Sequence, residues 1–212
     1  VMRYESIIWD WNGTLLDDLE VSLEVANEIL EQYRLPGLTI PQYRDIFDFP
    51  VSLYWQRAGL DLSTVNFETV SDLFGSAFFG RIHRAPVFDR ALSILEEVKS
   101  HGTLQFILSN TQQSTLEDML EAKRVDHFFA DIRGIQDSLA RGKTQAGLQL
   151  VADHSIQRSR TILIGDTLHD FEVATALEVD CLLISTGHHS HERLLASGAN
   201  VVSSLEEAIS KL

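Results

Sequence analysis

Short apolar runs alternate with amphipathic stretches over most of the chain, and each run ends near Gly, Ser, Asn or Asp. This alternation is typical of βαβ units and predicts a parallel sheet. The runs predict strands at 5–9, 104–108, 128–132, 161–164 and 181–184, with a short edge strand near 201–202. Apolar residues at helical spacing predict helices at 90–100, 114–122, 144–151, 171–177, 191–196 and 205–211.

One long stretch, 17–84, has helical periodicity and no strand pattern. Two apolar stripes carry it: Leu19, Leu23, Ala26 and Leu30, then Phe67, Val70, Phe74 and Ala77. We therefore predict a doubly wound α/β core of residues 1–16 and 86–212 with a small helical cap, residues 17–85, inserted after the first strand. The two connections, near 16–18 and 85–88, are expected to lie close together.

Charge narrows the possible partners. The chain has 212 residues and a formal net charge of -14, which disfavours nucleic acid and anionic membranes as partners. Neither a signal peptide nor a membrane span is readable, so a cytoplasmic protein is expected. We expect a monomer or a homodimer.

Polar residues follow several of the predicted strands. Asp10 ends the first strand, Ser109-Asn110-Thr111 ends the second, Lys143 begins a helix, and Asp166 and Asp170 follow a later strand. Ligands of open parallel sheets bind beyond the carboxyl ends of the strands, so these side chains are expected to meet there.

Their chemistry suits an anionic phosphate ester. Asp10 and Asp166 offer the oxygen ligands that Mg²⁺ prefers. Lys143, Ser109 and backbone N–H groups of the Asp10 turn would hold phosphate oxygens. With the metal in place, Asp10 could attack phosphorus and form an aspartyl-phosphate.

These motifs carry a family resemblance. The order Asp10-Trp11-Asn12-Gly13-Thr14, Ser109, Lys143 and Gly165-Asp166 with Asp170 resembles the haloacid dehalogenase superfamily of phosphohydrolases. The resemblance implies a Rossmann-like core, a helical cap and a small phosphorylated metabolite as substrate. It implies Mg²⁺ bound by Asp10, the Asn12 carbonyl and Asp166, with Asp170 in support. Phosphate would contact Trp11, Asn12, Ser109, Asn110 and Lys143. Cap size and the segments 186–189 and 192–195 look most similar to phosphoglycolate phosphatases.

Asn12 departs from the family pattern, because phosphatases of the family have an Asp there that protonates the leaving group and later activates water. A positioned acid–base contributes about 10²–10⁴-fold to rate. The sequence therefore predicts a slow phosphatase that favours acyl or aryl phosphates. The alternative is a protein on the same fold that binds phosphorylated ligands without productive turnover.

Two other branches of the superfamily fit poorly. Phosphonate cleavage uses a cap lysine, but every lysine lies outside the predicted cap, at Lys99, Lys123, Lys143 and Lys211. Dehalogenation needs no metal, whereas Asp166 and Asp170 preserve the metal pattern.

The cap holds candidates for contact with a second anionic group of the substrate: Arg44, Arg57, Arg81, His83 and Arg84. Its aromatic residues Trp55, Phe78 and Phe79 are expected to pack within the cap. Asp17 and Asp18 are expected to cap the first cap helix. His188, His189 and His191 lie in a polar segment and are expected to form a solvated or substrate-facing loop.

Overall fold

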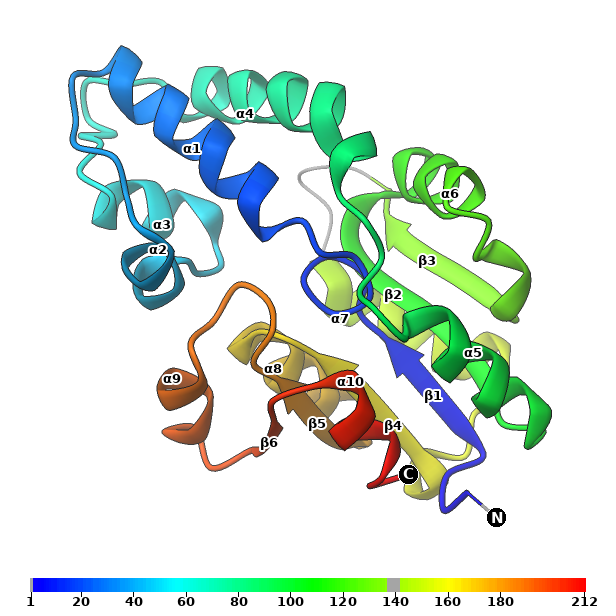
Figure 1. Ribbon diagram of the computed structural model, residues 1–212. Helices are drawn as coiled ribbons and strands as arrows, with labels where there is room; N and C mark the ends of the chain where they lie inside the picture. The colour runs from blue at the N-terminus through cyan, green and yellow to red at the C-terminus, as the bar shows by residue number, and fades with distance from the viewer. Residues whose placement is uncertain (1, 137–141) are drawn as a thin grey trace.

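The structure, a computed structural model, describes residues 2–136 and 142–212. Its centre is a six-stranded parallel sheet with the strand order β3-β2-β1-β4-β5-β6 (Figure 1). The strands are β1 Ser6–Trp9, β2 Leu104–Gln112, β3 Asp131–Ile135, β4 Thr161–Gly165, β5 Asp180–Ile184 and β6 Asn200–Val202. The predicted α/β parallel fold is confirmed. The order reverses at β1, so the crevice beyond β1 is where a ligand is expected.

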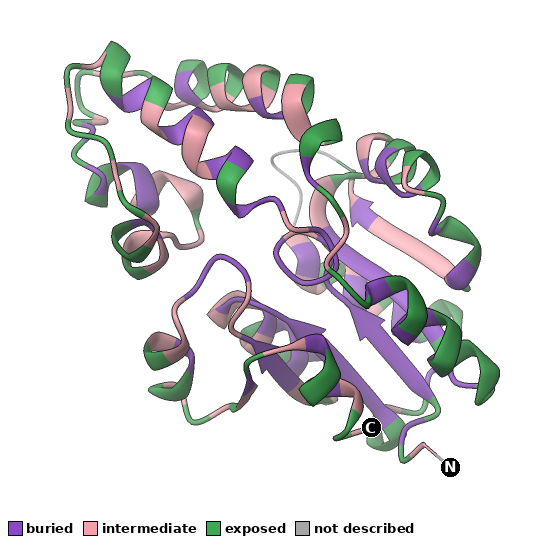
Figure 2. Ribbon diagram, viewed as in Figure 1, coloured by how far each residue is buried: buried purple, intermediate pink, exposed green. Residues whose placement is uncertain are grey.

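Alternation along β1 explains the two layers of helices. Ile7 and Trp9 are fully buried in the apolar cluster that includes α5 Ala91–Ser100, whereas Ile8, between them, is buried against α7 Gly142–Asp153. Successive strand residues point to opposite faces, and because both faces of β1 are covered, the strand is buried along its whole length (Figure 2). The remaining core helices are α6 Gln113–Ala122, α8 Leu168–Leu177, α9 His191–Leu195 and α10 Leu205–Ile209, and the 3₁₀ turns are η2 Asp126–Phe128 and η3 Arg158–Arg160.

Two strands differ from the sequence prediction. The run predicted as a strand at 128–132 begins as the turn η2, and β3 starts only at Asp131. The second strand does not end before Ser109: β2 continues to Gln112, where it pairs with Ile135 after a register shift. The irregular pairing interrupts the ladder at the polar residues, which the apolar pattern alone could not indicate.

Helices occupy the stretch between β1 and α5. They are α1 Leu19–Gln32, α2 Ile40–Ile46, α3 Val51–Arg57, α4 Phe67–Arg81 and the 3₁₀ turn η1 Ile82–Arg84. In Figure 1 they lie beyond the carboxyl ends of the strands, with α1 and α4 side by side. The predicted helical character of this stretch is confirmed over residues 17–84, all of which the structure describes. None of the helices in the described parts of the chain is long and apolar enough to cross a membrane.

The two connections between the cap helices and the core run side by side, as predicted. The backbone N–H of Asp17 donates to the carbonyl of Pro86 at 2.8 Å, and that of Phe88 donates to Leu15 at 2.9 Å. Leu16 and Val87 form an antiparallel bridge. Both entry points of the cap are thus held next to the Asp10 loop.

The buried side chains of the sheet stabilise the strands whose ends carry the site. Leu163→Ala in β4 removes a fully buried side chain, and we expect it to lower the free energy of unfolding by about 2–5 kcal/mol. Leu104→Ala in β2 is the matched control, because Leu104 is 53% exposed, and we expect a change within about 0.5 kcal/mol. Urea unfolding measures both, and equal midpoint shifts in the two variants would contradict this assignment of the core.

Candidate active site

Asp10 stands at the start of a tight loop that follows β1. Its backbone N–H donates to the Ile164 carbonyl at 2.8 Å, which fixes Asp10 beside β4. The Trp11 carbonyl accepts from the N–H groups of Leu15 and Leu16 at 3.0 Å, so the chain turns sharply after Asp10. Gly13 has φ +75°, and a Cβ there would collide with the Asp166 carboxylate. Glycine is therefore required both by the backbone conformation and by the close approach of Asp166.

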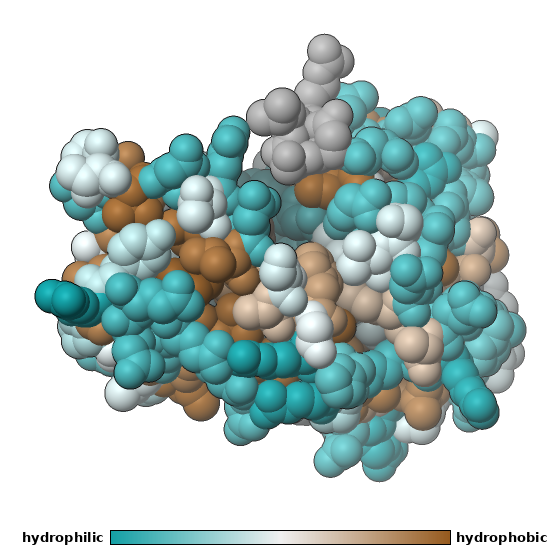
Figure 3. All heavy atoms as spheres, turned by 90° about the horizontal axis from the view of Figure 1, so that it is seen from above, coloured by the Kyte–Doolittle hydropathy of each residue, from teal (hydrophilic) through white to brown (hydrophobic). Residues whose placement is uncertain are grey.

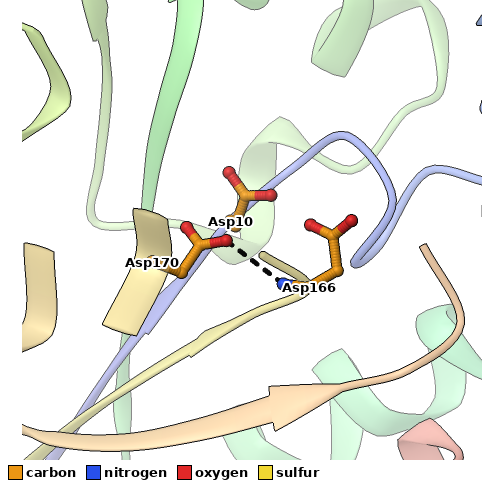
Figure 4. Close-up of side chains that lie close together, drawn as sticks. All are labelled: Asp10, Asp166 and Asp170. Atoms are coloured by element: carbon orange, nitrogen blue, oxygen red, sulfur yellow. Dashed lines mark hydrogen bonds between the residues drawn. The ribbon is translucent and has the colours of Figure 1, made fainter. Parts of the chain in front are cut away.

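Three buried carboxylates meet beyond β1 and β4. One oxygen each from Asp10, Asp166 and Asp170 can be chosen so that all lie within 4.8 Å of one another (Figure 4). The Thr14 hydroxyl lies 3.3 Å from an oxygen of Asp10 and 3.2 Å from one of Asp166. The three residues are at most 7% exposed. Such a cluster of oxygen donors can hold a divalent cation.

Lys143 enters the cluster from the first turn of α7. Its ammonium group donates to Asp10 and to Asp170, each at 2.5 Å, and the side chain is 2% exposed. Burial alone would lower the pKa of Lys143, but the two carboxylates outweigh it and raise that pKa. Lys143 is therefore a fixed positive charge at the site.

Asp170 is the most constrained of the three carboxylates. One oxygen accepts from Lys143, and the other accepts from the backbone N–H groups of Asp166 and Thr167 and from the Thr167 hydroxyl. These bonds cap the N-terminus of α8. Burial would raise the pKa of Asp170, but Lys143 and these donors lower it. Its first role is to orient Lys143 and the Asp166 backbone.

Asn12 is held by both ends of its amide. Its Nδ2 donates to Asp18 at 2.9 Å, and its Oδ1 accepts from the Thr111 hydroxyl at 3.0 Å. The amide therefore suits its surroundings, because a carboxylate at position 12 would face the carboxylate of Asp18. The side chain lines the cavity, but an amide cannot act as a general acid.

Asp18 and His188 lie beside Asn12 and make contacts that the sequence did not predict. Asp18 stands at the N-cap of α1, but its side chain makes no capping bond and instead contacts Asn12 and His188, the latter at 3.0 Å. His188 is 6% exposed and lines the cavity, so of the two expected settings, solvated or substrate-facing, its position agrees with the second. Tyr43 contacts the other ring nitrogen of His188 at 2.8 Å. The partners are 145 and 170 residues apart from His188 in the chain, so no local sequence signal could have joined them.

His188 supplies a second positive charge. Burial would lower its pKa, but the carboxylate of Asp18 outweighs this effect and raises the pKa to about 9. Its backbone N–H also donates to Asp166 at 2.6 Å. His189 differs: it is fully buried, and burial together with Arg193 lowers its pKa to about 3. Neutral His189 accepts the N–H of Leu168 at 3.1 Å and so has a structural role.

The residues predicted to bind phosphate lie close to this cluster. Ser109 and Asn110 lie on the irregular part of β2 and line the same cavity as Asp10, Asn12 and Lys143. The Ser109 Oγ accepts a hydrogen bond from the Thr111 N–H at 3.1 Å, and this bond stabilises the irregular backbone of β2. Trp11 is fully buried and is not among the described residues that line the cavity.

The cavity extends from the strand ends into the cap and has a volume of about 580 Å³. This size is in the range of small-molecule sites. Trp55, Phe78 and Phe79 line it, and their rings also contact other aromatic rings of the cap, so the prediction that they pack within the cap is confirmed. None of the five cationic cap residues proposed for a second anionic group is among the cavity-lining residues that the structure describes.

The comparisons with known proteins agree with this arrangement. A family model described as haloacid dehalogenase-like hydrolase matches residues 7–184. A phosphoglycolate phosphatase of Synechococcus elongatus is 22% identical over 195 residues, covering 91% of this chain and 89% of the relative. One from Pseudomonas fluorescens is 25% identical over 199 residues, covering 90% of this chain and 72% of the relative.

Solved structures show the same fold. A haloacid dehalogenase-like family hydrolase from Streptococcus pneumoniae superposes with a TM-score of 0.81 at 21% identity, covering 99% of both chains. A haloacid dehalogenase-like protein from Agrobacterium tumefaciens gives a TM-score of 0.81 at 20% identity, covering 98% of this chain and 96% of the other. With the family match spanning the strand-end residues described above, the chain belongs to the haloacid dehalogenase-like hydrolases.

Proposed function

We propose that this protein is a Mg²⁺-dependent phosphatase that hydrolyses small phosphate monoesters through Asp10. The observation that carries the proposal is the buried Asp10 carboxylate at the end of β1, with the Lys143 ammonium 2.5 Å away and Asp166 joined to it through Thr14. The phosphoglycolate phosphatases among the relatives support the reaction class. The cavity around Asp10 is large enough for a small metabolite.

Charge balance supports a divalent cation. Four buried carboxylates, those of Asp10, Asp18, Asp166 and Asp170, face two buried cationic side chains, Lys143 and His188, among the described residues of the cavity lining. Burial and, to a smaller extent, the neighbouring carboxylates raise the pKa of Asp10 well above its usual range and that of Asp166 to about 6. A cation of two charges would remove the excess of negative charge.

The donor set also fits magnesium. Asp10 and Asp166 would hold the ion together with the Asn12 carbonyl, and Asp170 would keep Asp166 and Lys143 in place. Mg²⁺ takes one or two carboxylates and completes its octahedron with water and substrate oxygens. When bound, it would polarise the phosphoryl group and offset the charge of the carboxylates.

The protein's own groups define the two chemical steps. An Asp10 oxygen attacks phosphorus, the bond from phosphorus to the ester oxygen breaks, and an aspartyl-phosphate forms. Lys143 and the Ser109 hydroxyl hold phosphate oxygens while charge moves to the leaving group. Water then attacks the aspartyl-phosphate and releases inorganic phosphate, and Asp10 is restored.

Asn12 limits this cycle at the leaving group. Its amide, fixed by Asp18 and Thr111, has no proton to give to a departing alkoxide. Turnover is therefore slow or selective for leaving groups that depart without a proton. The same observation favours a second candidate function. In this alternative, a protein with the same fold but weak catalysis binds a phosphorylated ligand or has a regulatory role.

Substitution at position 12 separates the two functions. We expect Asn12→Asp to raise the hydrolysis of alkyl phosphates by about 10²–10⁴-fold, because it restores an acid–base group. The single variant brings a carboxylate against Asp18, so the double variant Asn12→Asp/Asp18→Asn, which exchanges acid and amide, is measured beside it. Release of inorganic phosphate from a panel of alkyl and aryl phosphates gives the rates.

Two controls complete this experiment. Asp18→Asn alone should give no gain, and Asp10→Ala should abolish hydrolysis in every background. Activity in the native protein that Asp10→Ala removes supports the phosphatase, whereas activity only in the variants that carry Asn12→Asp supports the binding protein. Alkyl phosphate hydrolysis that is equally fast in the native protein, the single variant and the double variant would contradict the assigned role of Asn12.

Magnesium should stabilise the folded protein without any substrate. At a Mg²⁺ concentration 100 times its dissociation constant, linkage gives about 2.7 kcal/mol of added stability. We expect a corresponding rise of Tm that Asp166→Asn removes. Asp118→Asn, an exposed aspartate on α6, is the matched control and should keep the full rise. If the Tm of the native protein does not change when Mg²⁺ is added, the proposed metal site is wrong.

A further inference from the structure

The cap side of the cavity is an aromatic wall. Phe47, Phe49, Tyr54, Trp55, Phe74 and Phe78 all line it. Neighbouring rings contact one another: the centroids of Tyr54 and Trp55 lie 4.9 Å apart, those of Trp55 and Phe74 6.2 Å apart, and those of Phe74 and Phe78 5.4 Å apart. In Figure 3, hydrophobic residues gather on the cap side of a hollow in the face shown. This wall can stack on or pack against a planar apolar group.

Cationic cap residues are engaged elsewhere. Arg44 donates to the carbonyls of Gly187 and Thr186, Arg57 donates to Asp48, and Arg81 and Arg84 both pair with Glu24. On the cap side, the described lining contains no lysine or arginine. One cationic side chain of the described lining, His188, adjoins the wall, with its ring centroid 5.2 Å from that of Phe47, but its two ring nitrogens already contact Tyr43 and Asp18.

A second anionic group on a substrate would therefore lack a partner in the described part of the cap. Burial of an isolated carboxylate among aromatic rings is unfavourable, because the charge loses its hydration and gains no ion pair. Phosphoglycolate, the substrate named for the relatives, carries such a carboxylate. The wall in this protein suits a different organic group.

One polar atom in the wall has no partner. Three buried side-chain atoms of the described residues make no hydrogen bond, and of these only the Tyr54 hydroxyl belongs to a residue that lines the cavity. Tyr54 is 2% exposed. Buried hydroxyl groups almost always have a partner, so the Tyr54 hydroxyl is available to bond a polar group that enters the cavity. A neutral polar group on the substrate could supply the bond.

We propose that the substrates are phosphate monoesters of phenols that carry no second anionic group and have one neutral hydrogen-bonding substituent that contacts Tyr54. This assignment rests on the proposed phosphatase function and names its substrate class. It agrees with Asn12 by an independent route. A phenolic leaving group, with a pKa near that of tyrosine at about 10, needs less proton assistance than an alkoxide.

Binding of phosphonates tests the substrate class without the leaving-group step. With Mg²⁺ present, calorimetry compares benzylphosphonate with phosphonoacetate, which carries a carboxylate in place of the ring. We expect benzylphosphonate to bind the native protein at least tenfold more tightly. Phe74→Ala should reduce that preference at least fivefold. Phe129→Ala, which removes a partly buried ring that packs against the core outside the cavity lining, should preserve it.

Two further variants examine the polar details of the wall. At least one positional isomer of hydroxybenzylphosphonate should bind the native protein more tightly than benzylphosphonate, and Tyr54→Phe should remove that gain while benzylphosphonate binding stays the same. Ser71→Arg places a cation in the lining, and phosphonoacetate should then bind at least tenfold more tightly than to the native protein.

Inorganic phosphate separates the two levels of the proposal. If phosphate binds with Mg²⁺ but phosphonoacetate equals or exceeds benzylphosphonate, the substrate class is wrong and the phosphatase site stands. A Phe74→Ala variant with unchanged preference also overturns the substrate class. If neither phosphate nor any phosphonate binds, the proposed function fails, and the substrate class fails with it.

Discussion

The buried ion cluster around Lys143 is the interaction on which the site depends. One ammonium group joins Asp10, which follows β1, to Asp170 on α8, and it comes from α7. Three elements far apart in the chain thus converge on one point at the edge of the sheet. Removal of Lys143 would leave the buried carboxylates of Asp10 and Asp170 without their cation, which costs far more than the intact cluster contributes. The cluster is therefore best understood as a device that fixes geometry for an anionic ligand.

A second network surrounds Asn12 and links the cap to the core. Asp18 at the start of α1 contacts both Asn12 and His188, and His188 contacts Tyr43 of α2. Arg44, the next residue of α2, donates to carbonyls of the loop that carries His188. The amide at position 12 is thus part of a connected set of hydrogen bonds. Asp18 accepts from the Asn12 amide and Thr111 donates to it, so asparagine at position 12 leaves no buried polar group of its side chain unpaired.

Much of this could be predicted from the sequence, for identifiable reasons. Asp10, Lys143 and Asp166 follow strands or begin helices, and a parallel sheet brings such positions to one edge, so their meeting follows from topology. The extension of β2 through Ser109 to Gln112 was not predictable, because it depends on irregular pairing with β3. The role of Asp18 was missed because its position before a helix favours a cap, whereas a partner 170 residues away decides its orientation.

The cap shows why residue type alone predicts specificity poorly. Arginines in the sequence suggested contact with a second anionic group, but an acidic protein offers many surface carboxylates, and Arg81 and Arg84 pair with Glu24 and Glu28 outside the cavity. Aromatic residues suggested packing, and they do pack, yet a helical layer over a cavity has an inner surface that must be apolar to hold the cap together. The same rings therefore stabilise the cap and line the cavity. In this protein, the need for a hydrophobic cap core sets the polarity of the binding site.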